Sequence, residues 1–300
     1  MSPDLAITVG PLLYHWPEEQ ISAFYAELAR EAAVDRVYLG EVVCGKRAPL
    51  SRDVLERAAD QLLSAGKEVV WSTPALPLTA QDRAALAACA TRDLVELNDI
   101  SGLFGRPREA AFVAGPFLNI YNEFAAAELM ARGCRRLCAN VELSLEAIGA
   151  ITRALPDLEI EIFAFGRLPL AMSGRCYHAR LHGLHKDACR FVCRNDPDGL
   201  AVETIEGQPF LAMNGVQTLS HGVQLADVEP DRLRAAGVRA VRLSPQTSDM
   251  RGVARAFRAH LDGRTDRRQL RAAVQAANPP GPLINGYLHG APGHFWRPHA

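Results

Sequence analysis

The sequence predicts an α/β fold of the (β/α)8 barrel type. Eight short, β-branched apolar runs alternate along the chain with longer stretches of helical periodicity. Each run is apolar on both faces, as expected of a parallel strand that is covered on both sides. A length of 300 residues also suits a single barrel. A doubly wound sheet is the second choice, because the first turn, VGPLLYHWP, lacks a glycine-rich phosphate loop.

The elements are expected in strict alternation. Strands are predicted at 5–9, 35–39, 68–72, 94–98, 111–115, 136–140, 159–165 and 239–243. Helices are predicted at 18–32, 52–65, 80–90, 101–109, 122–132, 144–155 and 249–262. Such alternation of β and α units is typical of a parallel sheet.

Residues at the predicted helix ends support these boundaries. Ser51 and Ser144 precede helical stretches and are expected to act as N-caps. Gly66, Gly133 and Gly237 follow helical segments and precede strands, where a residue of left-handed backbone conformation usually ends a helix.

One connection is too long for a βα unit. Roughly 70 residues, 166–237, separate the seventh and eighth strands, where about 30 would suffice. This segment carries three cysteines and then a predicted hairpin with strands at 200–205 and 209–213. Long loops on a barrel are usually functional. We therefore predict a cysteine-bearing insert between strands 7 and 8.

The chain is expected to divide into two segments. Residues 1–265 would form the barrel with its insert, and residues 266–300 a C-terminal helix followed by a tail rich in proline and glycine. The tail contains Tyr287, Phe295 and Trp296, and such aromatic side chains favour packing against the barrel or against a partner protein.

The composition argues against several classes of protein. Lys and Arg number 33 against 34 Asp and Glu, so the net charge of −1 disfavours binding to nucleic acid or to an anionic membrane surface. No apolar run reaches the ~20 residues of a spanning helix. The first residues, MSPDLAITVG, lack the basic region of a signal peptide. We expect a cytoplasmic protein that binds no nucleic acid and has no transmembrane segment.

Four of the seven cysteines form a candidate metal site. Cys176, Cys189 and Cys193 share the insert, and Cys44 follows the second strand. The loops after all strands of a barrel open at one rim, so Cys44 can reach the insert. Four thiolates suit zinc or an iron–sulfur cluster. The spacing favours a [4Fe–4S] cluster, because structural zinc sites use two close cysteine pairs and only Cys189 and Cys193 form one.

The other three cysteines are interpreted as structural. Cys89 lies on the apolar face of a predicted helix, where a free cysteine acts as a small apolar residue. Cys134 is expected in the turn after a helix and Cys138 within a strand, so one helical face could not present both. The odd cysteine count in a chain of this size argues against a framework of disulfides.

Longer motifs are spread from one end of the chain to the other. They are GPLLYHWP (10–17), VYLGEVVCGKR (37–47), VAGPFLNIYN (113–122), VELS (141–144), GRLPLAMSGRCYHAR (166–180), NGVQT (214–218), VRLSPQ (241–246) and NGY (285–287). With these motifs the chain resembles the peptidase U32-like family, in particular its branch that acts in oxygen-independent ubiquinone biosynthesis.

The resemblance implies a cofactor, a function and partners. In that branch, cysteines at the positions of Cys44, Cys176, Cys189 and Cys193 ligate a [4Fe–4S] cluster. The implied function is that of an iron–sulfur subunit in oxygen-independent hydroxylation of the ubiquinone-precursor ring, with prephenate as hydroxyl donor. The implied partners are a UbiU-like protein, in a heterodimer, and a UbiT-like lipid-binding accessory protein that presents the prenylated ring intermediate.

Two other functions remain open from the residues. The chain could serve as a non-catalytic electron relay or structural partner of a catalytic subunit. A peptidase is disfavoured, because no HExxH or Gly-x-Ser-x-Gly signature is present. His178 and His182 are four residues apart, but they are expected in a charged loop and lack a catalytic glutamate.

No catalytic residue is assigned from the sequence. Arg242, at the end of the eighth predicted strand, and Arg175 are candidates to hold a carboxylate of the donor by bidentate contacts. The alternative for Arg242 is a structural pairing with helix carbonyls or with a loop acid.

Overall fold

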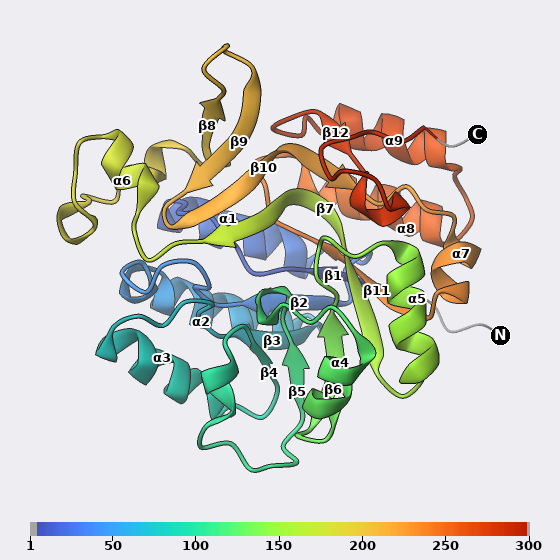
Figure 1. Cartoon of the computed structure of the whole chain (residues 1–300), viewed down its shortest axis with the longest axis horizontal. Coiled ribbons are helices and arrows are strands. Elements are labelled where there is room, and N and C mark those ends of the chain that lie inside the picture. Colours follow the sequence, from blue (N-terminus) through green and yellow to red (C-terminus); the bar gives the residue numbers. More distant parts are fainter. Residues whose placement is uncertain (1–4, 299–300) are drawn as a thin grey trace.

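Eight parallel strands close into a barrel (Figure 1). The computed structural model describes residues 5–298, so residues 1–4 and 299–300, the outer ends of the two predicted segments, lie outside the described residues. The strands are β1 (Ala6–Val9), β2 (Arg36–Leu39), β3 (Glu68–Ser72), β4 (Val95–Leu97), β5 (Phe112–Ala114), β6 (Cys134–Cys138), β7 (Glu159–Met172) and β11 (Val238–Leu243). Strand β11 pairs in parallel with both β7 and β1, which closes the barrel and confirms the predicted fold.

Helices follow most of the barrel strands. They are α1 (Glu18–Ala29), α2 (Ala48–Ser64), α3 (Ala80–Ala90), α4 (Glu123–Met130), α5 (Leu145–Ala154), α7 (Pro230–Ala235), α8 (Met250–Leu261) and α9 (Arg267–Ala276). Ser144 caps α5, because its side chain accepts a hydrogen bond from the backbone N–H of Ala147. The prediction for Ser51 is wrong: α2 begins earlier, and the Ser51 hydroxyl bonds to the carbonyl of Arg47 one turn before it. In the described chain no helix is long and apolar enough to cross a membrane.

Two element predictions in the first six units need correction. The helix predicted at 101–109 is only a 3-10 turn, Ile100–Leu103, because Gly105 has a left-handed backbone (φ 82°) and Pro107 follows it. Strand β6 begins two residues before its predicted start. Cys134 is therefore the first residue of a strand and not part of a turn.

The insert extends the barrel wall into an antiparallel sheet. Strand β7 continues to Met172, well past its predicted end at 165. It pairs antiparallel with β10 (Gln217–Leu225), which pairs with β9 (Pro209–Asn214), which in turn pairs with β8 (Leu200–Glu203). The hairpin of β8 and β9 was expected, whereas β10 was not. Figure 1 shows this hairpin projecting from the barrel beside the short helix α6 (Tyr177–Leu181).

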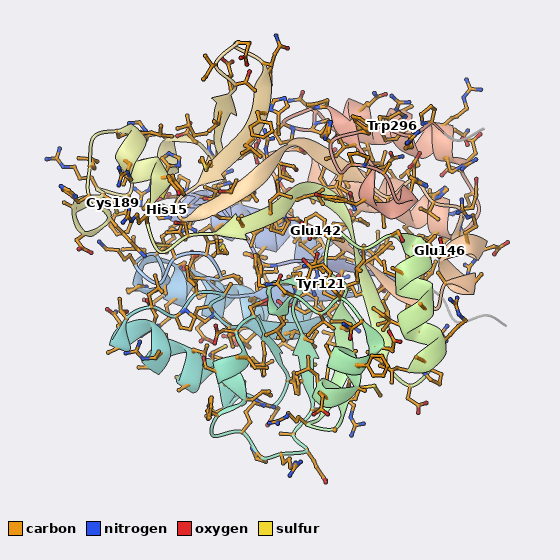
Figure 2. All side chains as sticks on the ribbon, in the orientation of Figure 1. His15, Tyr121, Glu142, Glu146, Cys189 and Trp296 are labelled. Atoms are coloured by element: carbon orange, nitrogen blue, oxygen red, sulfur yellow. The ribbon has the colours of Figure 1, made fainter. Side chains whose placement is uncertain are left out.

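The described part of the C-terminal tail packs against the rest of the chain. Strand β12 (Leu283–Ile284) pairs with β10. Asn285 is fully buried and exchanges hydrogen bonds with the backbone of Arg297. The ring of Trp296 lies 4.2 Å from the guanidinium of Arg271 on α9 (Figure 2).

Candidate functional site

The candidate site begins with the loop that follows β2. Oε1 of Glu41 accepts hydrogen bonds from the backbone N–H groups of Val43 and Cys44, at 3.0 and 2.9 Å. The same oxygen lies 3.2 Å from Nη2 of Arg47. One buried carboxylate therefore fixes both the backbone beside Cys44 and the guanidinium three residues later. Burial raises the pKa of Glu41, and the charge of Arg47 opposes that rise.

Arg47 is buried, and three cysteines lie close enough to interact with it electrostatically. Its side chain is 1% exposed, and it donates hydrogen bonds to the carbonyl of Leu13 and to Oδ1 of Asn214. Its Nε has no hydrogen-bond partner. Burial alone would lower the pKa of Arg47. The charge of Glu41, and then the charges that Cys193, Cys44 and Cys176 carry as thiolates, outweigh burial and raise the pKa of Arg47.

The insert supplies two of these three thiols. Cys176 precedes α6, and its Sγ accepts a hydrogen bond from the N–H of Ala179 at 3.4 Å. Cys193 lies buried in the 3-10 turn Val192–Asn195. Burial raises the pKa of the Cys193 thiol to about 11, against the opposing charge of Arg47. Burial likewise raises the pKa of Cys44. The Cys44 and Cys193 thiols are therefore protonated at neutral pH unless a metal binds them and displaces the protons.

Cys189 lies in a segment that is hydrogen-bonded to the loop that contains Cys44. Nζ of Lys46 donates a hydrogen bond to the carbonyl of Lys186, at 2.8 Å, three residues before Cys189. On the other side of Cys189, the ring of Phe191 lies 5.6 Å from that of His15. Cys189 itself is half-buried, and Figure 2 shows it on the outer loop beside α6. The structure thus brings Cys44, Cys176 and Cys193 together around Arg47 and holds the Cys189 segment beside them.

The remaining cysteines lie elsewhere. Cys134 and Cys138 are buried in β6, and Cys89 is half-buried on α3 against the apolar core. None of the three is among the thiols that act on Arg47. Their positions agree with the structural interpretation.

The side chain of Arg242 forms ion pairs inside the barrel. Its Nη1 lies 2.6 Å from Oε1 of Glu96 and its Nε lies 2.8 Å from Oε1 of Glu161, and all three side chains are buried. Its guanidinium also stacks 3.9 Å from the ring centre of Tyr38. Arg242 therefore has a structural pairing, with acids that come from strands β4 and β7 rather than from a loop. Arg175, the other candidate for a carboxylate, is exposed in the insert.

A cavity of about 410 Å³ opens at the ends of strands β4 to β7. Its apolar wall contains Phe117 and the last residues of β7. Its polar lining residues are Asn98, Asp99, Asn119, Tyr121, Asn140 and Glu142. None of the residues that line it is a lysine or an arginine. Ligands bind at this face of (β/α)8 barrels, because the loops after every strand meet there.

Hydrogen bonds fix the polar side of this cavity. The hydroxyl of Tyr121 donates to Oε2 of Glu142 at 2.7 Å, and Figure 2 shows the two residues close together near the middle of the view. Burial and this bond raise the pKa of Tyr121 to about 12. Nδ2 of Asn140 donates to Oδ1 of Asn119 at 3.2 Å. Oδ1 of Asn98 is buried and has no hydrogen-bond partner.

Sequence reasoning missed this cavity. Tyr121 and Glu142 lie within the motifs VAGPFLNIYN and VELS, which were noted only as a resemblance. Their position in the sequence could have indicated the cavity. Each motif begins in or beside a predicted strand and continues past the end of that strand. Polar residues at the ends of neighbouring parallel strands meet at one rim.

A second hollow, of about 370 Å³, opens beside Cys44. Lys46 and Lys186 line it together with Asp82 and Asp187. Leu76 lines both this hollow and the cavity at the ends of β4 to β7. The thiol-bearing loop and the larger cavity are thus neighbours.

Comparison with known proteins links the chain to one family. The model of peptidase family U32 matches residues 22–297. A tRNA hydroxylation protein P from Helicobacter pylori strain J99 is 33% identical over 99 residues, which cover 29% of this chain and 24% of that protein. A tRNA hydroxylation protein P from Escherichia coli K12 is 52% identical over 65 residues, which cover 21% of this chain and 14% of that protein. The matches thus span a quarter or less of these relatives.

Solved structures show only a loose likeness. The spore cortex-lytic enzyme SleL of Bacillus cereus has a TM-score of 0.39 at 9% identity, covering 95% of this chain and 76% of that chain. The sialic acid aldolase of Aliivibrio salmonicida has a TM-score of 0.34 at 13% identity, covering 92% of this chain and 79% of that chain. The barrel is assigned here from the strand pairing of the chain itself.

Proposed function

The chain belongs to peptidase family U32, and on that premise we propose that it is a subunit of the UbiV type. Such a subunit is the iron–sulfur component of a UbiU–UbiV-type complex that hydroxylates the ring of a ubiquinone precursor without molecular oxygen. Two curated relatives that match parts of the chain bear the name tRNA hydroxylation protein P, which supports a role in hydroxylation.

The single observation that carries the proposal is the gathering of three thiols around buried Arg47. We assign Cys44, Cys176, Cys189 and Cys193 as ligands of a [4Fe–4S] cluster. Four thiolates around such a cluster leave a net negative charge, and an adjacent guanidinium stabilises it. The unpartnered Nε of Arg47 is free to donate a hydrogen bond toward a ligand sulfur. The residues present therefore fit the group.

The sequence spacing of the cysteines favours a cluster over zinc. Structural zinc sites usually use two close cysteine pairs, and among these four only Cys189 and Cys193 form one. When bound, a cluster of four irons supplies one-electron redox chemistry at the rim.

We place the substrates in the two hollows beside this loop. The larger cavity presents Tyr121, Asn140 and Glu142, which suit the hydroxyl groups of an aromatic ring. It offers carboxylates and no cationic side chain, so an anion is disfavoured there. The hollow beside Cys44 offers Lys46 and Lys186 as well as Asp82 and Asp187. It is the one of these two hollows with cationic side chains, so we place the carboxylates of prephenate, the proposed hydroxyl donor, there.

The proposal includes partner proteins. A UbiU-like chain would form the heterodimer, and a UbiT-like accessory protein would deliver the prenylated ring intermediate. The hairpin of β8 and β9 exposes Ile205 and Phe210, two large apolar side chains that an interface would cover.

Anaerobic purification tests the cluster. We expect about four irons and four sulfides per chain, as a cubane held by four cysteine thiolates requires. Alanine at Cys44, Cys176, Cys189 or Cys193 should remove most of the iron. Cys89→Ala is the matched control and should keep it. Zinc in place of iron, or full iron in Cys44→Ala, would contradict the assignment.

Quinone measurements in cells test the reaction. Cells that carry Cys193→Ala should make no ubiquinone without oxygen and a normal amount with oxygen, because oxygen-dependent hydroxylases then perform the same steps. Equal loss under both conditions would indicate a role in assembly instead, and no loss under either would remove the cluster from the reaction.

Hydroxylation of RNA is the second candidate, because the matching relatives are named for tRNA hydroxylation. The near-neutral charge of this chain disfavours it. Retention of the purified chain on immobilised tRNA, measured between low and high salt, distinguishes the two. Strong retention that falls with salt would favour the RNA substrate.

A further inference from the structure

Three potential metal ligands lie together outside the cysteine site. They are His178, His182 and Asp196, and one ligand atom from each lies within 4.8 Å of the other two. In the part of the chain that the structure describes, this is the one set of three such atoms so close together. None of the three has a role in the proposed hydroxylation.

The short helix α6 brings the two histidines together. The sequence placed them in a charged loop, but α6 covers Tyr177–Leu181 and ends at His182. Residues four apart on a helix share one face. Their rings are accordingly almost parallel, at 13°, with centres 5.7 Å apart.

Asp196 completes the set from a later part of the insert. It directly follows the 3-10 turn Val192–Asn195. Its Oδ2 lies 2.9 Å from Nε2 of His178. The three residues thus connect the segment that contains Cys176 to the segment that contains Cys193.

An ordinary ion pair between His178 and Asp196 leaves part of this arrangement unexplained. Such a pair needs only the imidazole of His178. The imidazole of His182 nevertheless stacks on it, and a ring nitrogen of His182 lies within 4.8 Å of the Asp196 carboxylate. The degree of burial is graded: His178 is fully buried, Asp196 is intermediate and His182 is exposed. The set is therefore anchored on one side and open to water on the other.

We propose that His178, His182 and Asp196 form a second metal site that binds one divalent transition-metal ion, zinc in preference. Two imidazole nitrogens and one carboxylate oxygen are a ligand set that zinc accepts, with water in the fourth position. The bound ion would clamp α6 to the turn that contains Cys193. The site is independent of the proposed hydroxylation function, because it uses no thiol.

Cobalt binding to the purified full-length chain tests the proposal. Co²⁺ in a site of nitrogen and oxygen ligands gives visible d–d bands without the near-ultraviolet charge-transfer bands of cobalt–thiolate bonds. We expect one such ion per chain and its displacement by zinc. His182→Ala should weaken zinc binding at least about tenfold, since even a supporting residue of a metal site is worth 10–100-fold.

Matched variants separate this result from the cysteine site and from misfolding. His182 is exposed, so its removal leaves the core intact. His185→Ala removes an exposed histidine of the same insert and should bind zinc normally. Cys189→Ala should lose the proposed cluster and keep the cobalt spectrum. Unchanged zinc affinity in His182→Ala, or a spectrum with thiolate charge transfer that disappears in Cys189→Ala, would overturn the proposal.

Discussion

Glu41 and Arg47 form a buried ion pair in which the carboxylate oxygen and Nη2 lie 3.2 Å apart and the side chains are 8% and 1% exposed. The same carboxylate oxygen holds the backbone of Cys44, and the guanidinium lies among the thiols. A buried charge is tolerated when it is paired. This pair therefore allows a cation to lie buried beside the Cys44 loop.

Glu41→Gln should destabilise the chain substantially. The change leaves Arg47 as an unpaired buried charge, and breaking a buried pair in this way costs about 3–5 kcal/mol. Urea unfolding at pH 7 measures the loss. The exposed pair of Glu18 and Arg57 supplies the control, since Glu18→Gln should change stability by less than about 1 kcal/mol. Similar losses in the two variants would mean that water reaches Arg47.

The barrel was predictable because its signal is local. Each of the eight strands begins within two residues of its predicted start, since short apolar runs between helical stretches identify buried parallel strands. The failures arose where distant pairing decides the structure. Strand β7 extends to Met172 because β10, more than 40 residues later, pairs with its second half. No local pattern in either segment specifies that partner.

The candidate site was predictable in part for the same reason. Topology alone places the Cys44 loop and the insert at one rim, so the cysteines were accessible to sequence reasoning. The role of Arg242 could not be predicted. An arginine at the end of a strand gives the same sequence pattern whether it binds a ligand or pairs with a buried acid. Its partners Glu96 and Glu161 come from strands far apart in the sequence.

His15 should make the chain less stable in mild acid. Burial, and then the positive charges of Arg47 and Arg194, lower its pKa from 6.5 to about 4. Between about pH 6.5 and pH 4 the unfolded chain therefore binds a proton that the folded chain does not, so stability falls as the pH falls through this window.

The comparison of His15→Gln with the wild-type chain isolates this effect. Glutamine stays neutral, so the variant should lose less stability than the wild-type chain between pH 7 and pH 4.5 in urea unfolding. His185→Gln, at an exposed position, should follow the wild-type slope. A His15→Gln slope equal to that of the wild-type chain would show that His15 is protonated in the folded state.

Arg242→Met tests whether this arginine is structural. The change leaves Glu96 and Glu161 without their shared cation, and we expect a loss of about 3–5 kcal/mol in the free energy of unfolding at pH 7. The deficit should shrink in acid, because the Arg242 charge holds the pKa of Glu161 below its usual value and the wild-type chain loses that stabilisation when Glu161 is protonated. Arg57→Met, which breaks an exposed pair with Glu18, should cost less than about 1 kcal/mol. Normal stability in Arg242→Met would instead favour the interpretation that this side chain binds a carboxylate of the donor.

Gly115→Ala tests the packing behind the larger cavity. A Cβ atom at Gly115 would lie 2.0 Å from Oδ1 of Asn98, so the Asn98 amide must move. Asn98 is buried and bonded to Thr73 and Glu96, which leaves it little room. Overpacking of this kind costs about 1–3 kcal/mol. Gly174→Ala is the control, because its Cβ would meet only a leucine methyl at 3.6 Å.

Thermal unfolding and ligand titration together separate the two effects of Gly115→Ala. Its unfolding temperature should fall, while that of Gly174→Ala should not. Asn98 lines the cavity, so its displacement in Gly115→Ala should also weaken the binding of a phenolic ring compound, and Gly174→Ala should leave it unchanged. A fall in unfolding temperature with unaltered binding would remove Asn98 from the binding surface, because the amide would then have moved without affecting the ligand.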